Sequence, residues 1–179
     1  FGASDGDFSI VGDFEPAEIT QLMQQLFDDW KSPRPYQRIP VPYQDITPIN
    51  QNLETPDKAN AVFQAGMNLR LRDDNPDYPA LIVGNYLLGG SADSRLWRRI
   101  REQEGLSYNV ASTLSASAFD EQGEFNIYAI YAPENRARIE SALKEELARV
   151  MKEGFTAEEV ETAKAGYLQA RRVARGQER

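Results

Sequence analysis

Residues 94–110 read Ser-Arg-Leu-Trp-Arg-Arg-Ile-Arg-Glu-Gln-Glu-Gly-Leu-Ser-Tyr-Asn-Val. Apolar residues recur at helical spacing among the arginines, and this pattern predicts an amphipathic helix. Gly105 follows the last predicted turn, where glycine ends helices readily. The residues after it favour a β-strand. The stretch therefore predicts a helix that turns directly into a strand and holds Arg101 and Tyr108 in a fixed mutual position.

The sequence on either side predicts strands and helices in mixed order. Predicted strands cover residues 8–14, 60–69, 106–114 and 124–131, the last two as a hairpin. Predicted helices cover residues 16–30, 76–88, 133–151 and the segment after residue 156. Six prolines between residues 33 and 56 exclude a regular helix and favour a long extended connection. This order predicts an α+β fold, with a mainly antiparallel sheet and α-helices packed on one face.

Two C-terminal helices carry clear local signals. The helix over residues 133–151 has an apolar stripe at helical spacing, which we expect to be buried: Ile139, Leu143, Leu147 and Met151. For the last helix, Thr156 and Glu159 have the spacing of a capping box, in which each side chain bonds the backbone N–H of the other. The sequence thus predicts where this helix begins.

Composition narrows the class of protein. The chain of 179 residues is long enough for one domain with a sizeable core, so we expect a single domain over residues 1–179. It lacks an initiator methionine, and we expect it to be a fragment of a longer chain. Its net charge of −8 argues against binding to nucleic acid or to an anionic membrane. No apolar run has the length of a membrane span.

The chain contains no histidine and no cysteine. Catalytic zinc is normally held by imidazole or thiolate together with carboxylate, so the sequence predicts that this chain binds no metal. Any chemistry it joins would depend on contacts to a substrate.

Several motifs together resemble the non-catalytic, C-terminal-type domain of pitrilysin/insulinase-like zinc metallopeptidases, the inverzincins that include processing peptidases. The motifs are Leu87-Leu88-Gly89-Gly90-Ser91-Ala92-Asp93-Ser94-Arg95-Leu96, then Arg101, then Gly105-Leu106-Ser107-Tyr108. Weaker matches at residues 11–13, at residues 154–156 and in the helix that follows extend the resemblance over nearly the whole chain.

The resemblance implies a metal-free half of a zinc-dependent peptidase that faces a histidine-bearing catalytic half, in the same polypeptide or in a separate subunit. Zinc is then expected in the partner half, and the isolated chain is expected to be inactive. Arg101 and Tyr108 match the arginine and tyrosine that such halves present to a peptide substrate, Tyr108 toward the scissile carbonyl. A catalytically inactive scaffold or assembly subunit of the same fold is the alternative. Resemblance to large secreted zinc proteases favours the bacterial periplasm.

Each candidate residue also has a purely structural interpretation. Tyr108 shares a predicted strand face with Val110, so it could be a core tyrosine. Arg101 lies four residues after Trp97 and could simply stack on the indole at a solvated helix face. The basic cluster of Arg95, Arg98 and Arg99 is expected to pair with carboxylates of this acidic chain.

Overall fold

The computed structural model describes residues 2–177. The chain divides into two compact units, one made of Phe1–Ile39 with Val173–Arg179 and the other of Pro40–Arg172. The single domain expected over residues 1–179 stays a prediction. Among the described helices, none combines the length and the apolar character that crossing a bilayer requires.

The smaller unit contains helix α1, Pro16–Phe27, which begins at its proline as the sequence predicts. The strand predicted over residues 8–14 is wrong, because these residues take up no regular secondary structure. A strand persists only where a neighbouring strand supplies hydrogen-bond partners. The described part of this unit contains no other strand for residues 8–14 to pair with.

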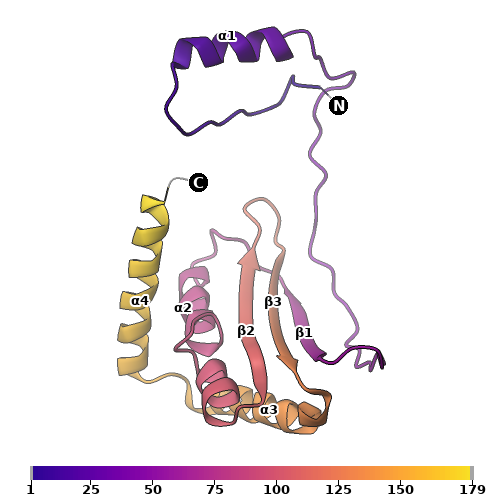
Figure 1. Cartoon of the computed structure of the whole chain (residues 1–179), viewed down its shortest axis with the longest axis vertical. Coiled ribbons are helices and arrows are strands. Elements are labelled where there is room, and N and C mark those ends of the chain that lie inside the picture. The colour runs from indigo at the N-terminus through magenta and orange to yellow at the C-terminus, as the bar shows by residue number, and fades with distance from the viewer. Residues whose placement is uncertain (1, 178–179) are drawn as a thin grey trace. The chain divides into compact units, whose positions relative to one another are not determined.

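The larger unit is built on a three-stranded antiparallel sheet (Figure 1). Its strands are β1 (Ala61–Leu69), β2 (Ser107–Ala116) and β3 (Gly123–Tyr131), in the spatial order β1-β3-β2. The hairpin of β2 and β3 forms as predicted. The extended connection before β1 carries no helix or strand, in agreement with its prolines.

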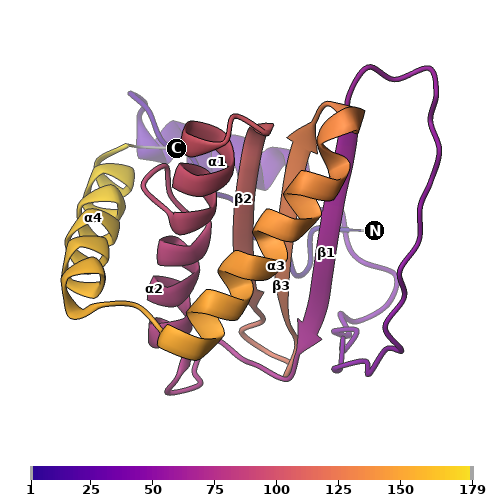
Figure 2. The same cartoon turned by 90° about the horizontal axis from the view of Figure 1, so that it is seen from below.

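Helices cover one face of this sheet, so the predicted α+β arrangement is confirmed (Figure 2). They are α2 (Tyr78–Leu88), the π-helix η1 (Trp97–Gln103) and α3 (Arg136–Glu153), which follows the short 3-10 helix η2 (Pro133–Asn135). Helix α4, Ala157–Gly176, lies beside α2, where the rings of Tyr86 and Tyr167 meet edge to face. Gly89 ends α2 so close to β2 that a Cβ would lie 2.6 Å from the backbone nitrogen of Ser112, which requires glycine there.

The core lies between the sheet and the helices. It contains the buried residues Leu88, Leu96, Ile100, Leu106, Val110, Ile127, Ala129, Tyr131, Ile139, Ala142 and Leu143. On α3, the expected burial of Ile139 and Leu143 is confirmed, but that of Met151 is wrong, since its side chain is 86% exposed. Glu146 is buried on the same helix instead, because it faces Arg99 of η1 and Arg95, which precedes η1.

Candidate functional site

The segment that carries Arg101 is a π-helix and not the α-helix that the sequence predicts. The N–H of Glu104 bonds the carbonyl of Arg99, five residues back, at 3.0 Å. Gly105 follows with a φ of 61°, a left-handed conformation that only glycine adopts at low cost. Such wide turns are frequent at functional sites because they displace side chains from their α-helical positions.

The guanidinium of Arg101 lies between two aromatic rings. Its Cζ is 4.3 Å from the ring centroid of Trp97 and 5.4 Å from that of Tyr108. One of its nitrogens donates a hydrogen bond to the backbone carbonyl of Tyr108. The predicted stacking on Trp97 is therefore confirmed, and the same contacts bring Arg101 and Tyr108 together. A guanidinium has five N–H donors, so this one bond leaves donors for a ligand.

Tyr108 is held away from the core by an irregularity in β2. Ser107 pairs with Tyr131, and the next pair is Asn109 with Ile130, so Tyr108 is the extra residue of a β-bulge. Its side chain is 77% exposed, whereas Val110 is fully buried. The interpretation of Tyr108 as a core tyrosine is wrong, because the bulge breaks the strand alternation on which it depends.

Ser107 stabilises this bulge from the buried side. Its hydroxyl lies 2.8 Å from the carbonyl oxygen of Asn109 and 2.7 Å from that of Ile130. A bulge disrupts the ladder locally, and the single O–H of Ser107 lies where it can donate to either of these two carbonyl oxygens. The exposed position of Tyr108 is thus part of the folded structure of β2.

The other arginines of the segment form a network of ion pairs, as the sequence predicts. Arg95 donates two hydrogen bonds to Glu159, at 2.9 and 2.8 Å, which tie the start of α4 to the segment. Arg99 pairs with Glu104 at 3.0 Å and also with Glu145. The buried carboxylate of Glu146 lies 3.8 Å from Arg95 and 3.7 Å from Arg99. In this network, the charge of these arginines is neutralised by neighbouring carboxylates.

Glu159 also completes the predicted capping box. It accepts a hydrogen bond from the backbone N–H of Thr156 at 2.8 Å, and the Thr156 hydroxyl accepts one from the N–H of Glu159. The hydrogen bonds from Arg95, followed by those from Thr156, lower the pKa of Glu159 to about 2. Glu159 therefore stays ionised through the whole physiological range.

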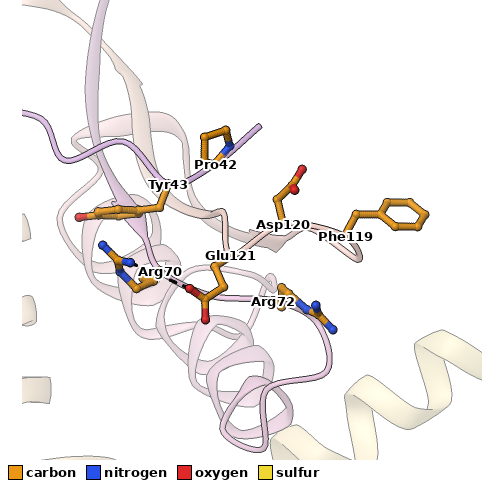
Figure 3. A pocket seen from close by; sticks show the side chains of 7 residues that line it. All are labelled: Pro42, Tyr43, Arg70, Arg72, Phe119, Asp120 and Glu121. Atoms are coloured by element: carbon orange, nitrogen blue, oxygen red, sulfur yellow. Dashed lines mark ion pairs between the residues drawn. The ribbon is translucent and has the colours of Figure 1, made fainter. Parts of the chain in front are cut away.

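A pocket of about 300 Å³ lies at the other end of the sheet, by the β2–β3 turn (Figure 3). It is lined by Pro42, Tyr43, Arg70, Arg72, Phe119, Asp120 and Glu121. The guanidinium carbon of Arg70 lies 4.7 Å from the ring centroid of Tyr43. The carboxylate of Asp120 accepts a hydrogen bond from the backbone N–H of Val41 at 2.9 Å. These contacts dock the incoming connection. Arg70 lies 4.0 Å from Glu121, and Arg72 pairs with Asp74. The pocket is a docking point for the connection, remote from Tyr108.

The residues of this chain do not fit a zinc ion. The sequence has no histidine or cysteine. Within residues 2–177, no three acidic side chains are grouped so that they could hold a metal. The carboxylates of the network described above already face arginines. A nucleophile generated by a metal would have to come from outside this chain.

The sequence analysis named Arg101 and Tyr108 as candidates, and the structure places two further polar residues beside them. Asn109 follows Tyr108 in the bulge, and its amide bonds the hydroxyl of Tyr128 on β3 at 3.2 Å. Neither belongs to a motif. Alternation along β3 puts Tyr128 on the face of the sheet that does not carry the buried Ile127 and Ala129. No sequence signal, however, places Tyr128 beside Asn109.

The sequence model of the family described as "Peptidase M16 inactive domain" matches residues 1–167. The chain is 36% identical over 84 residues to an uncharacterized zinc protease of Bacillus subtilis, a match that covers 47% of this chain and 20% of the relative. It is 39% identical over 85 residues to an uncharacterized zinc protease of Mycobacterium leprae, covering 48% and 19%. The matched segment thus spans about a fifth of either relative.

Solved structures share this architecture. The M16 inactive domain from Pseudomonas fluorescens superposes with a TM-score of 0.57 at 28% identity, over 62% of this chain and 26% of that one. A protease from Helicobacter pylori gives a TM-score of 0.66 at 17% identity, over 92% and 40%. The second likeness, at such low identity, concerns the fold alone.

Proposed function

The chain belongs to the peptidase M16 inactive-domain family, and from this premise we propose that it is the substrate-binding, metal-free half of a zinc-dependent peptidase. Under this proposal, it lines a chamber shared with a histidine-bearing half, located in the same polypeptide or in another subunit. The zinc belongs to that other half, and the isolated chain does not cleave peptides.

The observation that carries the proposal is the pairing of Arg101 with an outward-facing Tyr108. The bulge in β2 exposes the phenol, and the arginine packs against its ring. Neighbouring arginines of the same segment are bound by carboxylates. For Arg101, no ion pair is present within residues 2–177, and its charge remains for a ligand.

The two side chains suit the recognition of a peptide. The Tyr108 hydroxyl can donate a hydrogen bond to a substrate carbonyl, and the Arg101 guanidinium can bind a second carbonyl or a carboxylate through paired N–H donors. A donor that is aimed at the developing oxyanion contributes roughly a hundred- to a thousandfold in rate. Neither residue can activate water, so this chain's part is to bind and orient the peptide.

The test is Tyr108→Phe in the full-length protein together with its zinc-bearing half. We expect turnover of a peptide substrate to fall at least tenfold while the zinc content, measured by mass spectrometry, stays the same. Tyr43→Phe is the matched control, since it removes a phenol hydroxyl at the opposite end of the sheet. Unchanged turnover in Tyr108→Phe would reject the role. A parent protein without any inverted His-x-x-Glu-His helix would favour the inactive scaffold.

A further inference from the structure

The bulge in β2 leaves Tyr108 outside the ladder, between Ser107 and Asn109. Ser107 pairs with Tyr131 and Asn109 with Ile130, so the register shifts at Tyr108 and the usual alternation is suspended there. Alternation resumes at Val110, which points into the core. Asn109 is half-buried on the face turned away from the helices, directly beside the exposed Tyr108. The Arg101–Tyr108 pair is therefore adjacent along the chain to a polar residue on this face.

A row of neutral polar side chains crosses the face from this point. The amide of Asn109 lies 3.2 Å from the hydroxyl of Tyr128, which is half-buried on the central strand β3. Tyr128 pairs in turn with Gln64 of β1, whose side chain is exposed. Every strand of the sheet contributes one member, and none of the three carries a charge.

We propose that this row of Asn109, Tyr128 and Gln64 binds the main chain of an extended peptide that continues from the Arg101–Tyr108 pair. This inference rests on the proposed function, and it adds the manner in which the substrate is recognised. Adjacent strands lie about 4.8 Å apart, so the row spans roughly 10 Å, or about three residues of extended peptide.

The chemistry of the row matches a peptide backbone. A carboxamide offers both an acceptor oxygen and N–H donors, as a peptide group does. The Tyr128 oxygen already interacts with Asn109, so its own O–H remains as a donor for a substrate carbonyl. Because uncharged groups do not distinguish acidic from basic side chains, the row selects extended, unfolded segments with little regard to their sequence.

The experiment measures KM and kcat of the full-length protein with its zinc-bearing half, on a fluorogenic unstructured peptide. Tyr128→Phe should raise KM about fivefold with kcat changed less than twofold, as expected when one neutral hydrogen bond to bound substrate is lost. Gln64→Ala, at an exposed position that tolerates substitution, should raise KM by a similar factor. Tyr86→Phe, which removes a phenol hydroxyl on the helix side of the sheet, should leave KM unchanged.

Substrates that are N-methylated at successive backbone positions provide the second arm. At one position, methylation should raise the KM of the unmodified protein about fivefold and the KM of Gln64→Ala no further, because the same hydrogen bond is already absent. Exchange of lysine for glutamate in the same part of the peptide should change KM less than twofold. A change as large as that from methylation would overturn main-chain recognition.

The outcomes separate the two proposals. Wild-type KM in both Tyr128→Phe and Gln64→Ala, with turnover lost in Tyr108→Phe, would overturn this inference and leave the proposed function standing. Wild-type kinetics in all three variants would overturn both.

Discussion

Arg95 and Arg101 lie six residues apart in one short segment, yet their guanidinium groups have opposite surroundings. The side chain of Arg95 is only 13% exposed, bonds Glu159 twice and lies 3.8 Å from Glu146. Arg101 stacks between Trp97 and Tyr108 and bonds a backbone carbonyl. A cluster of arginines therefore says little about binding until the partner of each is known.

The difference also separates stability from function. Burial in the network costs Arg95 and Arg99 hydration, which is recovered only while their carboxylates are present. The hydrogen bonds that Arg95 donates to Glu159 and that Arg99 donates to Glu145 are the largest influence on each arginine, and they raise its pKa. Arg101 contributes little to the fold and keeps its donors. Three substitutions test this division, in order of decreasing effect.

Glu146→Ala should have the largest effect on stability, because it removes a buried carboxylate that lies near three arginines. Arg149 lies 3.4 Å from this carboxylate, in addition to Arg95 and Arg99. Removing one partner of a buried ion pair costs about 3 kcal/mol, so the free energy of unfolding in urea should fall by about that amount. Glu140→Ala is the control on α3, since its more exposed pair with Arg136 should be worth at most about 1 kcal/mol. Equal losses in the two variants would contradict a structural role for the network.

Glu159→Gln should have an intermediate effect that depends on pH. The folded pKa of about 2 lies below the ordinary value of 4.5, so the ionised group stabilises the fold above pH 4.5. This stabilisation is lost as the pH falls from 4.5 toward 2. At pH 6 the variant should be less stable by about 2 kcal/mol, as expected for charge-assisted hydrogen bonds.

Urea titrations of both proteins at pH 6 and pH 3 measure this difference. The gap between wild type and Glu159→Gln should narrow at pH 3. A gap that stays constant would show that the carboxylate charge is not what links α4 to Arg95.

Arg101→Ala should have the smallest effect on stability. It removes stacking on the half-buried ring of Trp97 and the exposed ring of Tyr108, which is worth about 0.5–1 kcal/mol. In the full-length protein with its zinc-bearing half, however, KM for a peptide should rise about tenfold, because charge-assisted hydrogen bonds to substrate are lost. Arg98→Ala is the control and should leave KM unchanged, since Arg98 is exposed and lies 3.9 Å from Glu159. If both variants gave the same KM, Arg101 would have no role in peptide binding that Arg98 lacks.

Most of the secondary structure of the larger unit could be predicted from local signals. Alternation found β1 and β3, glycines marked the ends of α2 and α3, and the Thr156–Glu159 box fixed the start of α4. These signals depend on residues close together in the chain, which is why a sequence pattern contains them. The strand expected over residues 8–14 failed because a strand also needs a distant partner, which no local pattern supplies.

Site prediction had the same limit. The motif identified Arg101 and Tyr108, and the expected ion pairs of the basic cluster formed. Periodicity assigned Tyr108 to the core face and Met151 to the buried stripe, and both assignments were wrong. In each case the structure departs from a regular repeat. One extra residue in β2 exposes Tyr108, and on α3 the buried residue is Glu146, which faces Arg95 and Arg99, while Met151 is exposed.

By itself, the amino-acid sequence determined that this chain holds no histidine or cysteine for a zinc site, that it alternates helices with antiparallel strands, and that an arginine and a tyrosine flank a glycine turn. Tertiary structure alone decided which arginine of the segment has no ion pair within residues 2–177 and that the tyrosine is exposed. The physical reason is that ion pairs and strand register join residues far apart in the chain. Glu159 is 64 positions from Arg95, and the bulge at Tyr108 depends on the pairing of Asn109 with Ile130 of another strand.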